Sequence, residues 1–271
     1  MPEYNNTVRN GGSLIEVSNS SLTGDSVTVT GNLSGANASG LPLYLNNATI
    51  TSQHDITLTG NGSPDSRAHS LELRGRNTLS AGGNIGISNT MGDTNVSGAI
   101  AVYLNGNTAG AANLTAGGNI TLNGNAGSAQ GVRVNNAAFN AKAANITGTS
   151  RTGGTGFTLS NLTLAGGVEN GANVTLSSAG SAAPATNSIG DGIFDAAHIT
   201  ALLTTGIENL TRVNATGLTL GNSSGDDWVQ DFSSAKGGGW IFDGATVNQA
   251  GNITLEGVGF TNGSVTAGRD L

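Results

Sequence analysis

A short apolar phrase recurs along this 271-residue chain and constrains its fold more than any other feature. Residues 114–122 read LTAGGNITL, residues 79–87 read LSAGGNIGI, and residues 250–255 read AGNITL. The phrase contains no acidic or basic side chain, so its repetition indicates a structural role rather than a catalytic one. Repeats of this kind indicate structural units, each of which buries its apolar side chains against the next unit.

Most units contain an apolar triplet with a polar middle residue. This alternation has a period of two, which is the pattern of a β-strand with one buried face. Gly-Asn, Asn-Gly, Gly-Gly and Ser-Gly pairs separate the triplets and are typical of tight turns. An aromatic content of 4% argues against a sandwich, whose strands are longer and richer in aromatic residues. Triplets lie at residues 27–29, 56–58, 71–73, 85–87, 120–122, 132–134, 162–164, 174–176, 218–220 and 253–255.

These features predict an all-β fold, a parallel β-helix (solenoid) in which small residues turn the corners. Asn residues that precede triplets, such as Asn84 and Asn119, suit corners because Asn tolerates left-handed backbone and bonds to neighbouring backbone. Aligned Asn side chains can also form ladders between coils. With roughly 20 residues per coil, the rod would be on the order of 60 Å long. The predicted core positions are Ile85, Ile87, Ile120, Leu122, Val174, Leu176, Ile253 and Leu255.

The pattern of apolar triplets and turn residues changes between residues 177 and 244. We therefore expect β-helix coils over residues 1–176, an extra-helical insertion or loop-rich segment over 177–244, and further coils over 245–271. Apolar residues at helical spacing from Asp195 to Leu203, followed by Gly206, predict one short helix in this irregular excursion.

The same segment contains both tryptophans of the chain within a Gly-rich and Asp-rich stretch. One interpretation is that the indoles cover an apolar face of a coil. The other is a ligand or partner site, because Trp is enriched at binding hot spots and a carboxylate adds polar specificity. The predicted binding residues are Trp228 and Trp240 for the contact surface, with Asp226, Asp227 and Asp231 for specificity.

Composition disfavours several other classes of function. The net charge is −7, and ten scattered Lys and Arg residues form no stripe for nucleic acid. The chain has no Cys, and its three His residues lack metal-ligand spacing, so we expect no metal site and no cofactor. No apolar run approaches the roughly 20 residues of a membrane span, so we expect no membrane insertion. We also expect the basic residues Arg67, Arg74, Arg76, Arg133, Arg151 and Lys236 to share no face.

Seventeen N-x-S/T sequons occur in the chain, and in nine of them the middle residue is Ile, Leu or Val of the strand motif. Most of the excess over chance is therefore a by-product of the coil pattern, although glycosylation stays open as a modification. The candidate glycosylation sites are Asn37, Asn47, Asn214 and Asn262.

The phrases AGGNITL, NLTLAGG, GANVTL and VTAGRDL resemble repeats of the filamentous haemagglutinin superfamily. These large exoproteins of Gram-negative bacteria are exported by two-partner secretion and include the high-molecular-weight adhesins. The resemblance covers most of residues 20–180 and 244–271. It implies a right-handed parallel β-helix, an outer-membrane translocator as partner, and a secreted or cell-surface location. The NPNG-type motifs of the family's secretion domain are not seen, so we expect an internal fragment of such a protein.

Two functions follow from this interpretation. The first is a structural and adhesive segment that attaches to host cells or other bacteria through a surface receptor, with glycans among the candidate receptors. The alternative is a β-helix carbohydrate-active enzyme, a polysaccharide lyase or hydrolase. Such an enzyme needs acidic and basic residues that converge on one groove, and the dispersed basic residues favour a protein that is not an enzyme.

Overall fold

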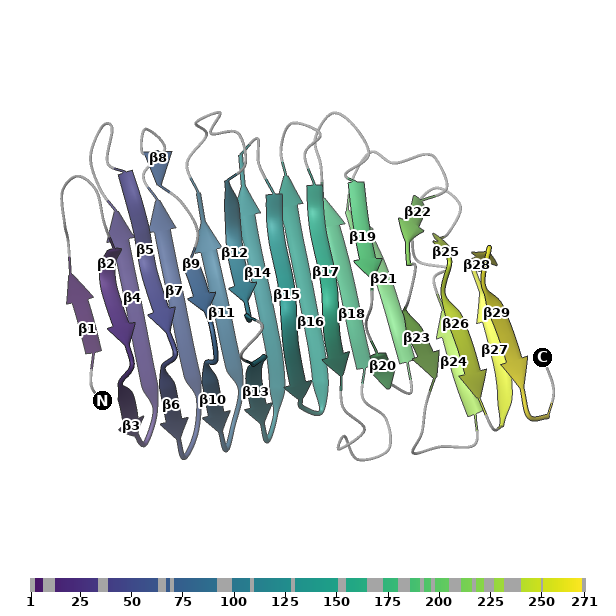
Figure 1. Cartoon of the computed structure of the whole chain (residues 1–271), viewed down its shortest axis with the longest axis horizontal. Helices are drawn as coiled ribbons and strands as arrows, with labels where there is room; N and C mark the ends of the chain where they lie inside the picture. Colours follow the sequence, from purple (N-terminus) through teal and green to yellow (C-terminus); the bar gives the residue numbers. More distant parts are fainter. Residues whose placement is uncertain are drawn as a thin grey trace.

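The computed structural model is a parallel β-solenoid, as predicted from the repeats (Figure 1). It describes residues 3–6, 13–33, 39–62, 67–68, 71–91, 99–107, 110–127, 130–150, 155–164, 173–179, 186–190, 193–195, 198–204, 211–215, 218–221, 227–231, 240–249 and 251–269. Over these ranges the regular structure is strand, and none of it is a helix that could cross a membrane.

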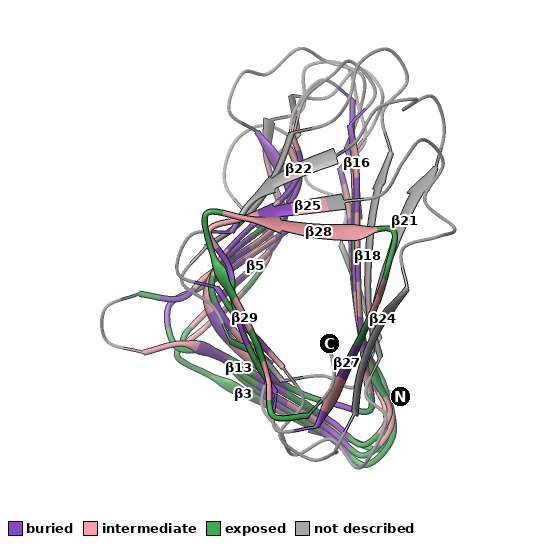
Figure 2. Cartoon of the chain, turned by 90° about the vertical axis from the view of Figure 1, so that its right-hand side faces the viewer, coloured by how far each residue is buried: buried purple, intermediate pink, exposed green. Residues whose placement is uncertain are grey.

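Three ladders of parallel strands form the sides of the solenoid, and the view along the rod shows them around one interior (Figure 2). The first ladder contains β1 (Glu3–Asn6), β4 (Val27–Leu33), β7 (Ile56–Gly62), β11 (Ile85–Thr90), β14 (Asn119–Ala126), β16 (Ala143–Ser150), β18 (Asn173–Ala179), β21 (His198–Thr204), β24 (Asp227–Asp231) and β27 (Asn252–Glu256).

The second and third ladders share two long strands, β15 (Gln130–Asn140) and β17 (Thr155–Leu164), which pass through both. The second ladder also contains β2 (Ser13–Ser18), β5 (Ser39–Asn46), β8 (Arg67–Ala68), β9 (Leu71–Arg74), β12 (Ile100–Asn105), β19 (Thr186–Gly190), β22 (Thr211–Asn214), β25 (Trp240–Asp243) and β28 (Val258–Thr261). The third also contains β3 (Ser21–Gly24), β6 (Thr49–Ser52), β10 (Thr78–Ala81), β13 (Ala112–Ala116), β20 (Ile193–Asp195), β23 (Thr219–Gly221), β26 (Thr246–Gln249) and β29 (Ser264–Ala267).

The core consists of columns of apolar side chains, in which each residue stacks on its counterpart in the next coil. Ile85 pairs in register with Ile56 on one side and with Ile120 on the other, and all three side chains are fully buried. Burial of an Ile or Leu side chain contributes about 1.5 to 3 kcal/mol. Of the predicted core positions, Ile85, Ile87, Ile120, Leu122 and Ile253 are buried, Leu255 is partly buried, and Val174 and Leu176 pair in register with Ala144 and Ile146.

Most coils are longer than the predicted 20 residues. Equivalent residues of successive coils, such as Asn32 and Asn61, lie 29 residues apart, and the separation ranges elsewhere from 18, between Asp243 and Thr261, to 35, between Asn84 and Asn119. Each coil contains three strands with turns or loops between them, and this path requires more residues than the sequence repeat suggests. The ten rungs of the first ladder therefore span about 43 Å, which is shorter than the predicted rod.

Asn residues occupy the corners, as predicted. Asn84 donates from its backbone N–H to Asp55 Oδ1 at 2.6 Å, and Asn119 donates to Asn84 Oδ1 at 2.9 Å, so these corners stack as a ladder. At the corner between the second and third ladders, Asn residues with φ near +50° allow the sharp turn. These left-handed residues are Asn19, Asn47, Asn136, Asn161 and Asn262.

The short helix predicted from Asp195 to Leu203 is wrong, because Ile193–Asp195 is β20 and His198–Thr204 is β21. Residues of β21 pair in register along the whole of β18, which supplies backbone hydrogen bonds that a helix would have to make locally. The described strands between residues 177 and 244 continue all three ladders. Backbone pairing of β21 with β18 on one side and β24 on the other outweighs the local apolar spacing that suggested a helix.

Glycines form a column where the first and second ladders come closest. Gly124 of β14 and Gly148 of β16 are in register, and they face Gly131 of β15 and Gly156 of β17. A Cβ atom on Gly148 would collide with the carbonyl oxygen of Gly156, whereas a Cβ atom on Gly86 would meet no atom within 4 Å. The close approach of the two ladders therefore requires glycine at Gly148 but not at Gly86.

We predict that Gly148→Ala lowers the free energy of unfolding by about 1 to 3 kcal/mol or more, since the obstructing atoms belong to backbone. Gly86→Ala is the matched control, and it should leave stability unchanged or slightly raised. Urea denaturation of both variants checks this prediction. Equal stability of the two variants would contradict the proposed contact between ladders.

Candidate binding face

The structure places the two predicted binding tryptophans on different sides of the coil. Trp228 lies in β24 of the first ladder, in register with Ile253, and Trp240 lies in β25 of the second ladder, in register with Val258. Asp227 and Asp231 are the first and last residues of β24, and Asp226 lies outside the described residues. The proposed binding role of these five residues stays a prediction.

The candidate glycosylation sites Asn47 and Asn262 are exposed corner residues with left-handed backbone. The Nδ2 atom of Asn47 donates to Asn19 Oδ1 at 3.4 Å, and Nδ2 of Asn262 donates to Asp243 Oδ1 at 2.6 Å. A sugar on either nitrogen would have to be accommodated within a corner ladder. Asn214 is the last residue of β22, and Asn37 lies outside the described residues.

The outer face of the second ladder carries a column of aromatic and charged side chains that sequence analysis missed. We call this column the tyrosine strip, and one residue of each successive coil contributes to it. Its members follow each other in register along the rod: Glu16 of β2, Tyr44 of β5, Glu72 of β9, Tyr103 of β12 and Arg133 of β15.

The strip faces outward because the residues on either side of each member face the core. Leu43 and Leu45 are fully buried around the partly buried Tyr44, and Leu71 and Leu73 are fully buried around Glu72. The same alternation places Val102 and Leu104 in the core on either side of Tyr103, and Val132 and Val134 on either side of Arg133.

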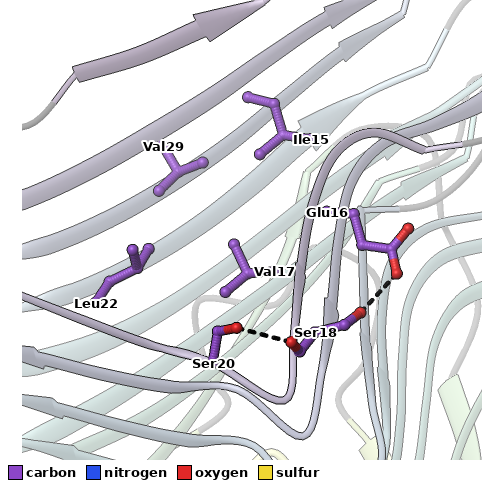
Figure 3. A pocket seen from close by; sticks show the side chains of 7 residues that line it. All are labelled: Ile15, Glu16, Val17, Ser18, Ser20, Leu22 and Val29. Atoms are coloured by element: carbon purple, nitrogen blue, oxygen red, sulfur yellow. Dashed lines mark hydrogen bonds between the residues drawn. The ribbon is translucent and has the colours of Figure 1, made fainter.

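The first coil shows this separation of inside from outside in atomic detail (Figure 3). Ile15 and Val17 of β2 lie with Leu22 and Val29 around the interior, where they line a largely apolar cavity of about 500 Å³ at the end of the solenoid. Glu16 points away from that group and accepts a hydrogen bond from Ser18 Oγ at 2.6 Å. The cavity thus lies at the end of the core, and Glu16, Ser18 and Ser20 form its polar margin.

A second row runs beside the strip, two residues further along each strand. It consists of Ser18, Asn46, Arg74, Asn105 and Asn135, which are also in register from coil to coil. Asn135 Nδ2 donates to Asn105 Oδ1 at 3.4 Å. The expectation that the basic residues share no face is wrong for Arg74 and Arg133, because both project from this face.

Glu72 lies at the centre of the strip, between the rungs of Tyr44 and Tyr103. Desolvation by burial raises the pKa of its carboxyl group, while the positive charge of Arg74 and a hydrogen bond from the Asn105 side chain oppose the shift in part. The net shift is upward from the ordinary value of 4.5. This carboxyl group is therefore more easily protonated than a fully solvated one.

Arg133 lies over the ring of Tyr103, with its guanidinium carbon 5.4 Å from the ring centroid. A cation at this distance is attracted by the quadrupole of the ring, and the attraction contributes roughly 0.5 to 1 kcal/mol at an exposed site. The contact restricts both side chains before any ligand arrives. Restriction of this kind favours binding because less conformational entropy is lost on association.

The face combines two aromatic rings, two carboxyl groups, two guanidinium groups and several amides on a rigid support. Such a surface can stack on a flat apolar ligand face and form hydrogen bonds around it. Among the described residues, no three acidic or histidine side chains lie close enough together to hold a metal ion.

A sequence signal for the strip exists in the middle residues of the apolar triplets. LYL at residues 43–45, LEL at 71–73, VYL at 102–104 and VRV at 132–134 have bulky aromatic or charged centres, whereas most triplets have Thr or Gly there. Their alignment on one face depends on the coil lengths, which the sequence repeat did not reveal.

Comparisons with protein-family models, with curated proteins and with solved structures find no match to this chain.

We predict that protonation of Glu72 stabilises the fold. Because its folded-state pKa is raised, its contribution is fully present below 4.5 and is lost as the pH rises through the folded-state value. Glu72→Gln should therefore gain stability relative to the original chain as pH rises from about 4 to about 7. Thermal unfolding across this range checks the sign, with the exposed Glu16→Gln as control. A stability difference between chain and variant that does not change with pH would contradict it.

Proposed function

We propose that this chain is a structural and adhesive segment of a large secreted or surface-exposed bacterial exoprotein. In this function it attaches to host cells or other bacteria, and an outer-membrane translocator exports the protein that contains it. The translocator and the surface location come from the resemblance of the repeats to filamentous haemagglutinins.

The observation that carries the adhesive role is the tyrosine strip on a rigid support. Surface aromatic and Arg side chains supply much of the binding energy at protein interfaces, whereas small polar side chains supply little. The outer face of the third ladder offers mainly exposed Ser, Thr and Asn, as at Thr49 and Thr51, and is suited to hydration rather than to contact. The strip is therefore the better attachment surface.

We predict that the double variant Tyr44→Ala, Tyr103→Ala lowers attachment of the purified chain to target cells by about tenfold or more. Loss of two stacking surfaces should weaken binding without unfolding the chain, since both residues project outward. Flow cytometry with labelled protein measures the attachment, and circular dichroism verifies the fold.

The control is Thr49→Ala, Thr51→Ala on the third ladder, which should bind like the original chain. Variants Trp228→Ala and Trp240→Ala belong in the same assay, because they test the other predicted contact surface. If the tyrosine variant binds normally and the tryptophan variants do not, the attachment surface is not the tyrosine strip.

The alternative function is a carbohydrate-active enzyme of β-helix architecture. One observation favours it, namely that Glu72, a carboxyl group with raised pKa, lies beside Arg74 on a surface fit for a polymer. Hydrolases and lyases require a second acid or base placed across the bond that breaks. The nearest acid of the strip, Glu16, is two rungs away, with Tyr44 between them.

We therefore predict no cleavage of polysaccharides by this chain. Incubation with pectin, hyaluronan and a neutral glucan should release no reducing or unsaturated ends above a buffer control. A signal that disappears in Glu72→Gln would instead establish the enzymatic alternative.

A further inference from the structure

We infer that the tyrosine strip binds a linear, uncharged polysaccharide whose chain lies parallel to the rod axis. The inference rests on the proposed function, because it names the chemistry of the receptor to which the adhesive segment attaches.

The direction of the ligand follows from the arrangement of the strip. Its residues occupy equivalent positions in successive coils, so they form a line along the rod rather than a compact pocket. Rungs of a parallel sheet are about 4.8 Å apart, which places Tyr44 and Tyr103, two rungs apart, at about 10 Å. Two rings at this distance are too far apart for one sugar ring and suit neighbouring units of a chain.

The separation also leaves the tyrosine rings available for a ligand. Phe242 and Phe260 show the opposite case, since they occupy adjacent rungs and stack on each other with centroids 5.7 Å apart and an angle of 19°. Glu72 occupies the rung between Tyr44 and Tyr103, so the two tyrosines cannot stack in this way. Arg133 covers one face of the Tyr103 ring, so the other face of that ring and the ring of Tyr44 remain for the apolar C–H face of a sugar.

The charge of the face argues for an uncharged polymer. Two acidic residues, Glu16 and Glu72, are balanced by two basic ones, Arg74 and Arg133, so neither sign is in excess. An anionic polysaccharide would require a surplus of Arg or Lys, and the net charge of −7 repels it further. A cationic polymer would be repelled by the guanidinium groups of Arg74 and Arg133.

The second row supplies groups that match sugar hydroxyls. The amides of Asn46, Asn105 and Asn135 each offer donors and acceptors, as hydroxyl groups do. They lie beside Tyr44, Tyr103 and Arg133 in register, so a chain stacked on the strip has amide partners at these three rungs. Aromatic stacking and a flanking row of amides are thus combined along one line.

The test uses a panel of soluble linear polysaccharides in affinity gel electrophoresis. The panel contains neutral glucans, mannans, galactans and acetylated chitin oligomers, with polygalacturonate and chitosan as charged members. We expect at least one neutral member to retard the chain and neither charged member to do so. Retardation by charged members alone, or by no member, would overturn the inference.

Calorimetric titration with oligomers of the retarding polymer then tests the geometry. Affinity should rise with oligomer length until both tyrosines are covered, and Tyr103→Ala should remove the gain from the longer oligomers. Each Tyr→Ala variant should lose about tenfold in affinity, while Tyr44→Phe and the control Thr49→Ala, Thr51→Ala should retain it. A length dependence that is identical in Tyr103→Ala and in the original chain would contradict a ligand lying along the strip.

The outcome is separable from that of the proposed function. If the tyrosine variants lose cell attachment, no polysaccharide binds, and protease treatment of the cells abolishes attachment, the adhesive function holds with a protein receptor and this inference fails. If a neutral polysaccharide binds through the strip but no cell is bound, this inference holds and the adhesive function fails.

Discussion

The parallel hydrogen-bonded ladder between successive coils is the constraint on which the rest of this structure depends. A strand of one coil obtains its backbone partners only from the equivalent strands before and after it, so residues at equivalent positions must face the same way. Ile56, Ile85 and Ile120 stack in the core for this reason, and Tyr44, Glu72 and Tyr103 align on the surface for the same reason. Core and candidate site are therefore consequences of one register.

The register also explains where glycine and asparagine are needed. At the corners, left-handed Asn residues turn the chain, and hydrogen bonds such as that from Asn161 Nδ2 to Asn136 Oδ1, at 3.1 Å, connect one coil to the next. Where the first and second ladders meet, Gly124 and Gly148 leave room for the facing backbone. The register repeats these requirements from coil to coil, so residue types recur in columns.

The strands of the core were predictable from sequence, because an alternating apolar pattern such as that of Ile85 and Ile87 indicates a β-strand with one buried face. The segment from Asp195 to Leu203 was not, since its apolar spacing fits both a helix and a strand, and only pairing with β18 and β24 decides between them. The tyrosine strip was missed because the coil length, which brings residues about thirty positions apart into line, is a property of the folded coils.

The inside and the outside of such a solenoid are under different constraints, and this difference bears on how its surface acquires function. An inward position such as Val132 must fit the columns of the core, so only apolar residues of suitable size are tolerated there. The adjacent outward position, Arg133, is exposed and lies over the ring of Tyr103, so the packing of the core does not limit its charge or shape. A change at the middle residue of a triplet therefore alters the surface without disturbing the ladder. Because the ladder places each such residue about 4.8 Å from the next, a few substitutions one coil apart suffice to create a linear recognition surface on an otherwise uniform rod.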